Sequence, residues 1–441
     1  MSEPGAAPGV VAPSGPARQS DLHAFSTAGL RLIRLRAHVN PPQDLLKWRD
    51  AGAAWAVLEL LSPQPGRELT SPEDFVAAFS PTIETFLGLD LRHIEVQSEP
   101  NRADRGAGSS WQDGAAFSVW FEEVCHRLRI RFGDAVEIGF PALAASDAPH
   151  PDPAARIAAP AFLAQCASAI DVADWVALHI YWRTLEQMRN LQGAMGCLRT
   201  YLAAYPEQHF IITAFANVNR MLDPTGRGQQ YAEYLTLMAQ YDRILGVIGS
   251  PLRSSDPGHN ALAWIGPGGQ DTGVIAALAG RPGLPDPQRL SMAWPTDRHA
   301  YLQDFGAHQR AYYDCCQMTG GHNGVDLAVD TERPDPSPIG AALAGTVSQV
   351  ALDAEGYGYH VRVRSYGPEG ETVTLLYAHL SAIEVGVGTL VDRGDVLGWV
   401  APDAQGAEPH LHLGLHVAGI RLPQVHDALN PRPYLDRALS G

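Results

Sequence analysis

The sequence predicts a multidomain protein in which an N-terminal (β/α)₈-like barrel of the α/β class precedes a mainly antiparallel β domain. Three observations support this fold class. The 441 residues provide enough material for about two or three domains. Strand-like and helical runs alternate over residues 28–255, as expected for a parallel sheet covered by helices. After residue 290 the runs are short and alternating, with glycines and acidic turns between them, which is typical of antiparallel sheets.

The predicted boundaries divide the chain into four segments. Residues 1–20 are rich in Pro, Ala, Gly and Ser, and we expect them to form a disordered tail. The barrel is expected over residues 21–277 and the β domain over residues 291–441. Residues 278–290 are rich in Gly and Pro and are expected to form the linker between them.

Seven strand-like runs carry the barrel prediction. They are Arg31–Val39, Trp55–Leu61, Arg92–Ser98, Val136–Leu143, Val176–Trp182, His209–Ala216 and Ile244–Leu252. Helical runs lie between them, beginning at Ser71-Pro72, Phe117 and Gln229. The eighth strand is expected either near Pro65–Thr70 or at the start of the chain. A doubly wound open sheet is the alternative, although no Gly-rich phosphate loop follows the first run.

The composition limits the classes of partner. The net charge of −16 argues against nucleic acid and against adsorption to anionic surfaces. No apolar run reaches the roughly 18 residues of a membrane span, so we expect no membrane insertion. The five cysteines show no pattern that implies a disulfide framework. The oligomeric state is not indicated.

Three histidine-containing segments follow one another in the predicted β domain. His410 and His412 stand at alternate positions of a strand and therefore point to one face of it. His322 and Asp326 flank the turn signal Asn323-Gly324, and His379 ends a further strand-like run. Two imidazoles and a carboxylate form a three-ligand zinc site that leaves one position for water. Additional histidines beside such a site can act as general base or as oxyanion donor.

Together these segments resemble the lysostaphin/LytM-type zinc endopeptidases, which cut peptidoglycan peptides. The resemblance covers about residues 290–441 and extends to Trp294-Pro295 and Asn430-Pro431. It implies that the ligands of Zn²⁺ are His322, Asp326 and His412. It also implies that His379 and His410 form the catalytic pair.

The resemblance thus predicts a zinc-dependent endopeptidase whose substrate and partner is bacterial peptidoglycan. The alternative is a non-catalytic wall-binding or hydrolase-activating protein with a structural metal site. Peptidoglycan lies outside the cytoplasm, yet residues 1–19 show neither the basic nor the apolar region of a signal peptide. The localisation and the route of export or release therefore stay open.

A second resemblance concerns the barrel. Ser98-Glu99-Pro100-Asn101 is similar to the acid/base motif of clan A glycoside hydrolases, and two later runs are similar to strand ends of that family. Ala214 stands where the family has its nucleophilic Glu, so glycoside hydrolysis by two carboxylates is expected to be absent. The barrel is then either a spacer or a glycan-binding domain. The candidate glycan-binding residues are Glu99, Asn101, His179, Tyr181, Trp182 and Asn217.

Overall fold

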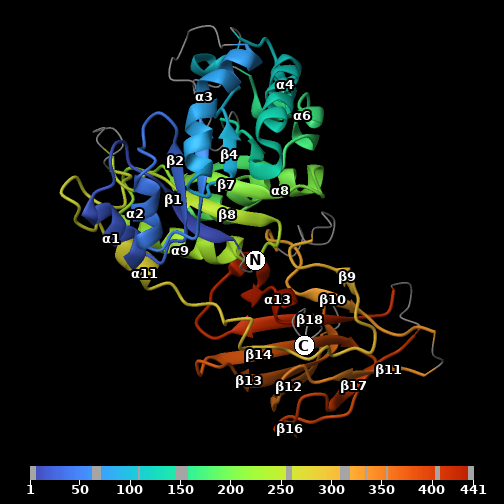
Figure 1. The fold of residues 1–441 in the computed structure, drawn as a ribbon. Helices are drawn as coiled ribbons and strands as arrows, with labels where there is room; N and C mark the ends of the chain where they lie inside the picture. Colours follow the sequence, from blue (N-terminus) through green and yellow to red (C-terminus); the bar gives the residue numbers. More distant parts are fainter. Residues whose placement is uncertain are drawn as a thin grey trace. The chain divides into compact units, whose positions relative to one another are not determined.

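The computed structural model describes residues 6–61, 71–107, 110–144, 157–254, 261–307, 318–332, 335–353, 356–402 and 408–435. The chain divides into two compact units, Glu3–Arg281 and Pro282–Gly441 (Figure 1). Within the described ranges, no helix has both the length and the apolar character needed to cross a membrane.

The first unit is a closed barrel of parallel strands, which confirms the predicted (β/α)₈-like fold. The strands follow one another around the barrel in chain order, and β8 pairs with β1 to close it. They are β1 (Ala7–Val11), β2 (Leu32–Arg36), β3 (Trp55–Leu60), β4 (His93–Val96), β5 (Glu137–Phe140), β6 (Trp175–Trp182), β7 (Phe210–Asn217) and β8 (Ile244–Gly249).

The eighth strand lies at the start of the chain, and the expectation of a disordered tail is wrong for residues 6–20, the part of that segment that the structure describes. Strand β1 pairs with β2 along one edge and with β8 along the other. Val10 is fully buried, so ladder hydrogen bonds and apolar burial offset the entropy cost of ordering this segment. Residues 65–70, the other expected place, lie outside the described ranges.

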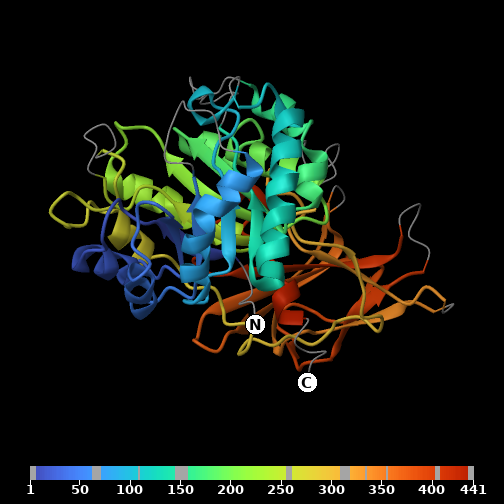
Figure 2. The ribbon, with the colours of Figure 1, turned by 45° about the horizontal axis from the view of Figure 1, so that its top comes forward.

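Helices alternate with the strands on the outside of the barrel (Figures 1 and 2). Helix α3 begins at Pro72, as predicted, and Ser71 caps it, because its side chain accepts a hydrogen bond from the Asp74 N–H. The helices are α1 (Gln19–Thr27), α2 (Asp44–Asp50), α3 (Pro72–Leu87), α4 (Gly114–Phe132), α5 (Ala159–Leu163), α6 (Ala167–Asp171), α7 (Leu185–Arg189), α8 (Ala194–Ala204), α9 (Pro224–Met238) and α11 (Val274–Ala279).

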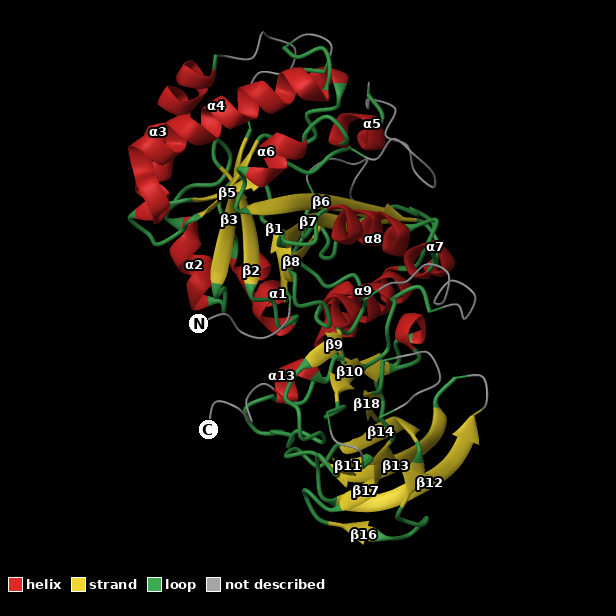
Figure 3. Cartoon of the chain, turned by 90° about the vertical axis from the view of Figure 1, so that its right-hand side faces the viewer, coloured by secondary structure: helices red, strands yellow, loops and turns green. Residues whose placement is uncertain are grey.

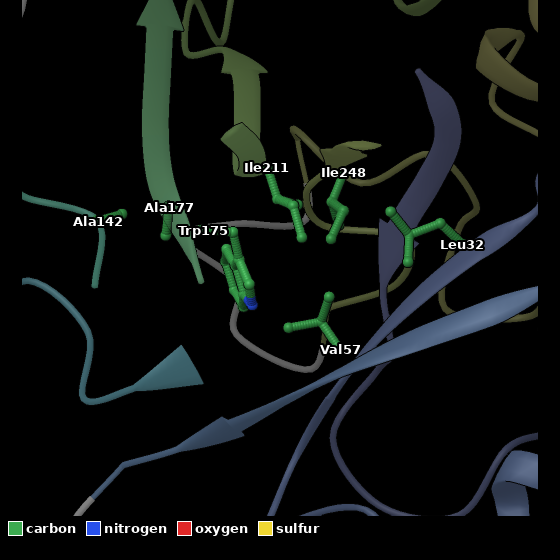
Figure 4. Close-up of a cluster of buried hydrophobic side chains, with 7 residues drawn as sticks. All are labelled: Leu32, Val57, Ala142, Trp175, Ala177, Ile211 and Ile248. Atoms are coloured by element: carbon green, nitrogen blue, oxygen red, sulfur yellow. The ribbon is translucent and has the colours of Figure 1, made fainter. Parts of the chain in front are cut away.

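Apolar side chains from several strands fill part of the barrel. Figure 4 shows Val57, Trp175, Ile211 and Ile248 turned toward a common centre. Gly139 on β5 makes room for the Trp175 ring, because a Cβ atom at Gly139 would lie 2.3 Å from it. Such a layer of side chains makes the barrel a packed core rather than a pore.

The second unit is built mainly of antiparallel strands, as predicted (Figure 3). One sheet has the order β16-β12-β13-β14-β18-β10-β9, with β19 also paired to β18, and a smaller sheet has the order β11-β17-β15. The elements are β9 (Tyr301–Gln303), β10 (Val325–Ala328), β11 (Ser337–Gly340), β12 (Gly345–Asp353), β13 (Gly358–Tyr366), β14 (Thr372–Leu380), β15 (Ala382–Ile383), β16 (Leu390–Val391), β17 (Val396–Val400), β18 (His410–Val417), β19 (Ala428–Leu429) and α13 (Arg432–Leu435).

Candidate active site

Strand pairing brings the three histidine-containing segments of the second unit together. Strand β18 lies between β10 and β14, and His412 is the residue opposite both Asp326 on β10 and Ala378 on β14. His410 and His412 alternate with Leu411 on β18. Leu411 is fully buried, so the two histidines share the opposite face.

A glycine allows the His322 segment to lie against β18. A Cβ atom at Gly324 would lie 2.5 Å from the carbonyl oxygen of Leu413 and 2.7 Å from Cε1 of His412. Any other residue would therefore push the segment away from the strand. Gly324, which was part of the predicted turn, thus allows His322 to lie beside His412.

The donor atoms of His322, Asp326 and His412 converge. The distance from His322 Nε2 to His412 Nδ1 is 2.9 Å, and each of these nitrogens lies 3.1 Å from Asp326 Oδ1. Donors bound tetrahedrally to zinc at about 2.0–2.1 Å would lie about 3.3 Å apart. The three residues therefore form a group that could hold a metal ion, and their spacing fits zinc.

Hydrogen bonds on the far side of the imidazoles orient them. His322 Nδ1 lies 3.1 Å from the carbonyl oxygen of Asp304 and His410 Nδ1 lies 2.7 Å from that of Glu408. A carbonyl oxygen only accepts, so each Nδ1 carries a proton and donates it, and Nε2 is the ring nitrogen that lies toward the other site residues. Such partners fix the tautomer of metal-ligating histidines.

The carboxyl group of Asp326 is ionised. Burial opposes its ionisation, but hydrogen bonds and charge interactions with His322 and His412 outweigh burial and hold its pKa well below the usual range. The deprotonated form is the one that binds a metal ion.

His379 and His410 lie beside this group. Their ring centroids are 4.9 Å apart, and His379 is 6.0 Å from His412 by the same measure. His410 Nε2 lies 3.9 Å from Asp326 Oδ2. The His379 side chain is exposed, so a substrate could reach it. All five residues singled out in the sequence are thus brought together.

Comparison with known proteins gives the family of this unit. Residues 320–424 match the sequence model for Peptidase family M23. The chain carries a peptidase M23 domain. Members of this family are metallopeptidases.

The M23 domain is similar to several known proteins. An uncharacterised metalloprotease of Haemophilus influenzae is 36% identical over 98 residues, which is 22% of this chain and 19% of that protein. The DD-carboxypeptidase/endopeptidase Mpg of Neisseria meningitidis is 33% identical over 117 residues, which is 26% of this chain and 25% of that protein. The chain thus spans a quarter or less of the length of these relatives. The catalytic domain of lysostaphin from Staphylococcus simulans is 23% identical, with a TM-score of 0.26 over 31% of this chain and 92% of that one.

All six candidate glycan-binding residues lie in the barrel unit, and three of them have no exposed surface. Asn101, Trp182 and Asn217 are fully buried. Each side chain is hydrogen-bonded to protein groups, Asn101 to Ala144 and the other two to Gln230. Their assignment to a glycan-binding surface is therefore corrected, because these side chains are buried and hydrogen-bonded within the protein and are not exposed to a sugar.

The other three candidates lie close together, although His179 is also buried. His179 Nδ1 is 2.8 Å from Glu99 Oε1, Arg102 donates to Glu99 Oε2 at 3.2 Å, and the ring centroids of His179 and Tyr181 are 5.9 Å apart. Burial opposes ionisation of Glu99, but the hydrogen bond and charge of His179 and the charge of Arg102 lower its pKa to about 2. Glu99 is thus ionised at neutral pH and has no proton to donate as a general acid.

The barrel also contains a buried cluster of charged side chains that was not predicted from the sequence. One guanidinium nitrogen of Arg34 lies 2.6 Å from Glu95 and 3.1 Å from Glu59, and all three side chains are buried. Glu59 and Glu95 are register partners on β3 and β4. A sequence pattern could have indicated this cluster: each of the three charged residues stands within a strand that is otherwise mostly apolar.

Proposed function

We propose that this protein is a zinc-dependent endopeptidase that hydrolyses peptide bonds of bacterial peptidoglycan. One observation carries the proposal: the donor atoms of His322, Asp326 and His412 lie within 4.8 Å of one another. His379 and His410 lie beside them. This combination of three ligands and two further histidines is what a hydrolytic metal site requires.

The residues have separate roles in the proposed reaction. A zinc ion held by the three ligands would acidify a bound water and polarise the scissile carbonyl. His410 donates its Nδ1–H to the Glu408 carbonyl, so in its neutral form it would have Nε2 as the acceptor that takes a proton from the attacking water. His379 is exposed beside it and can donate to the oxyanion that forms on the substrate.

The substrate class rests on similarity. The name of the Neisseria relative describes a DD-carboxypeptidase/endopeptidase, and the sequence pattern resembles enzymes that cut peptidoglycan peptides. We assign the barrel the role of a glycan-binding or spacer domain. Ala214 on β7 and the ionised Glu99 both support the absence of glycosidase activity.

The test combines metal analysis with an activity assay. Protein purified without added metal is analysed for zinc, and new amino groups released from purified peptidoglycan are measured with and without a chelator. One zinc per chain with chelator-sensitive amine release supports the proposal. Zinc without release of amines from several wall types would favour the non-catalytic wall-binding alternative. Absence of both would refute the proposed function.

A further inference from the structure

A tyrosine outside the proposed ligand set makes three contacts with residues in or next to the candidate metal site. Tyr357 lies in the turn between β12 and β13, and its hydroxyl, ring and carbonyl each touch a different part of the site. We propose that Tyr357 is a positioning residue that holds the zinc ligands and His379 in their working arrangement. The inference rests on the proposed function of the M23 domain.

The first contact passes through Asn323. Asn323 Nδ2 donates a hydrogen bond to Tyr357 Oη at 2.6 Å, and the Asn323 side chain is 3% exposed. Asn323 follows His322 directly in the chain. A buried amide has no water to replace a lost partner, so the Tyr357 hydroxyl restrains the backbone that carries the first ligand.

The second contact is made by the ring. The centroid of the Tyr357 ring lies 5.5 Å from that of His412, with an angle of 35° between the planes, and 5.9 Å from that of the buried His360. The phenol therefore forms a wall against the second imidazole ligand. This wall restricts rotation of His412 and keeps its Nδ1 directed at Asp326.

The third contact is made by the backbone. The Tyr357 carbonyl accepts a hydrogen bond from the His379 N–H at 2.9 Å. His379 has a φ of 65°, in the left-handed region that non-glycine residues rarely adopt. Because the tyrosine side chain is held by Asn323 and His412, its carbonyl is held too, and this helps keep His379 in its unusual conformation.

Four single variants and the double variant Tyr357→Phe/Asn323→Ala test the inference. Tyr357→Phe removes only the hydroxyl, Tyr357→Ala removes the ring as well, and Asn323→Ala removes the partner. Tyr359→Phe removes a hydroxyl two residues away on a half-exposed side chain and is the matched control. Zinc affinity is measured by competition with a chromophoric chelator, and unfolding curves verify that each variant is folded.

We expect Tyr357→Phe to weaken zinc binding about tenfold and Tyr357→Ala to weaken it by a further factor of about ten, within the usual range for residues that support metal ligands. Asn323→Ala is expected to match Tyr357→Phe, and the double variant to lose no more than either single variant, because both remove one interaction. Tyr359→Phe is expected to bind zinc like the wild type. In kinetics, Tyr357→Phe is expected to lower kcat more than it changes KM.

The two proposals fail in different measurements. Wild-type protein that binds zinc but cleaves no peptide would refute the endopeptidase function, while the ratio of zinc affinities between variants would still test Tyr357. A folded Tyr357→Phe protein with wild-type zinc affinity, kcat and KM would overturn the role of Tyr357. Additive losses in the double variant would overturn the route through Asn323. A wild type that binds no zinc would overturn both proposals.

Discussion

Replacing Glu99 by Gln is expected to destabilise the barrel by about 2–3 kcal/mol at pH 7. The pKa of the Glu99 carboxyl is lowered from 4.5 to about 2, because the interactions with His179 and Arg102 outweigh the effect of burial. Each pKa unit corresponds to about 1.4 kcal/mol, so the ionised carboxylate contributes about 3 kcal/mol. The side chain is only 14% exposed, which leaves little screening by solvent. Gln retains one acceptor for the His179 N–H, which reduces the expected loss slightly.

The loss should depend on pH with a defined sign. A carboxyl group with a lowered folded-state pKa stabilises the folded state above its unfolded pKa and loses this effect as the pH falls through its folded pKa. The contribution of Glu99 should therefore be complete above about pH 5 and fall to about 2 kcal/mol at pH 3.5. The difference between wild type and Glu99→Gln should narrow accordingly.

Denaturant unfolding followed by tryptophan fluorescence provides the assay. All tryptophans except Trp294 and Trp399 lie in the barrel unit, so the signal reports mainly on the barrel. The matched control is Glu137→Gln. Glu137 also pairs with a histidine, His93, at 3.0 Å, but its side chain is 45% exposed, so its loss should stay below about 1 kcal/mol. A Glu99→Gln loss that equals the control, or that does not shrink between pH 7 and pH 3.5, would refute the reasoning.

Two further predictions concern the metal centre and the barrel core. His410→Ala is expected to retain zinc but lose about 10²–10⁴-fold in turnover, whereas His412→Ala is expected to lose zinc as well. Elemental analysis and the amine-release assay check both variants. A folded, zinc-free His410→Ala protein would contradict this division of roles. Gly139→Ala is expected to destabilise the barrel by about 1–3 kcal/mol, because the new Cβ would lie 2.3 Å from the Trp175 ring. Gly88→Ala, where the nearest atom lies 3.4 Å away, serves as the control in thermal unfolding, and equal losses in the two variants would argue against the overpacking.

Local sequence patterns determined most of the barrel strands and part of the candidate site. Seven barrel strands were predicted near their observed positions, because strand-like runs and the turn residues between them are local signals. The grouping of the candidate site residues was also predicted in part. His410 and His412 share a strand face through simple alternation, and the Gly324 turn before β10 marks the position of His322.

Tertiary structure decided the features that depend on distant partners. Residues 7–11 were expected to belong to a disordered tail rich in Pro, Ala, Gly and Ser, yet they form β1 because β2 and β8 supply hydrogen bonds on both edges. Trp182 was predicted as a candidate glycan-binding residue, yet its indole is buried and donates a hydrogen bond to Gln230. The Tyr357–Asn323 contact joins residues 34 positions apart. Composition and periodicity indicate which strands form, but only the paired strands determine where each side chain points and what it touches.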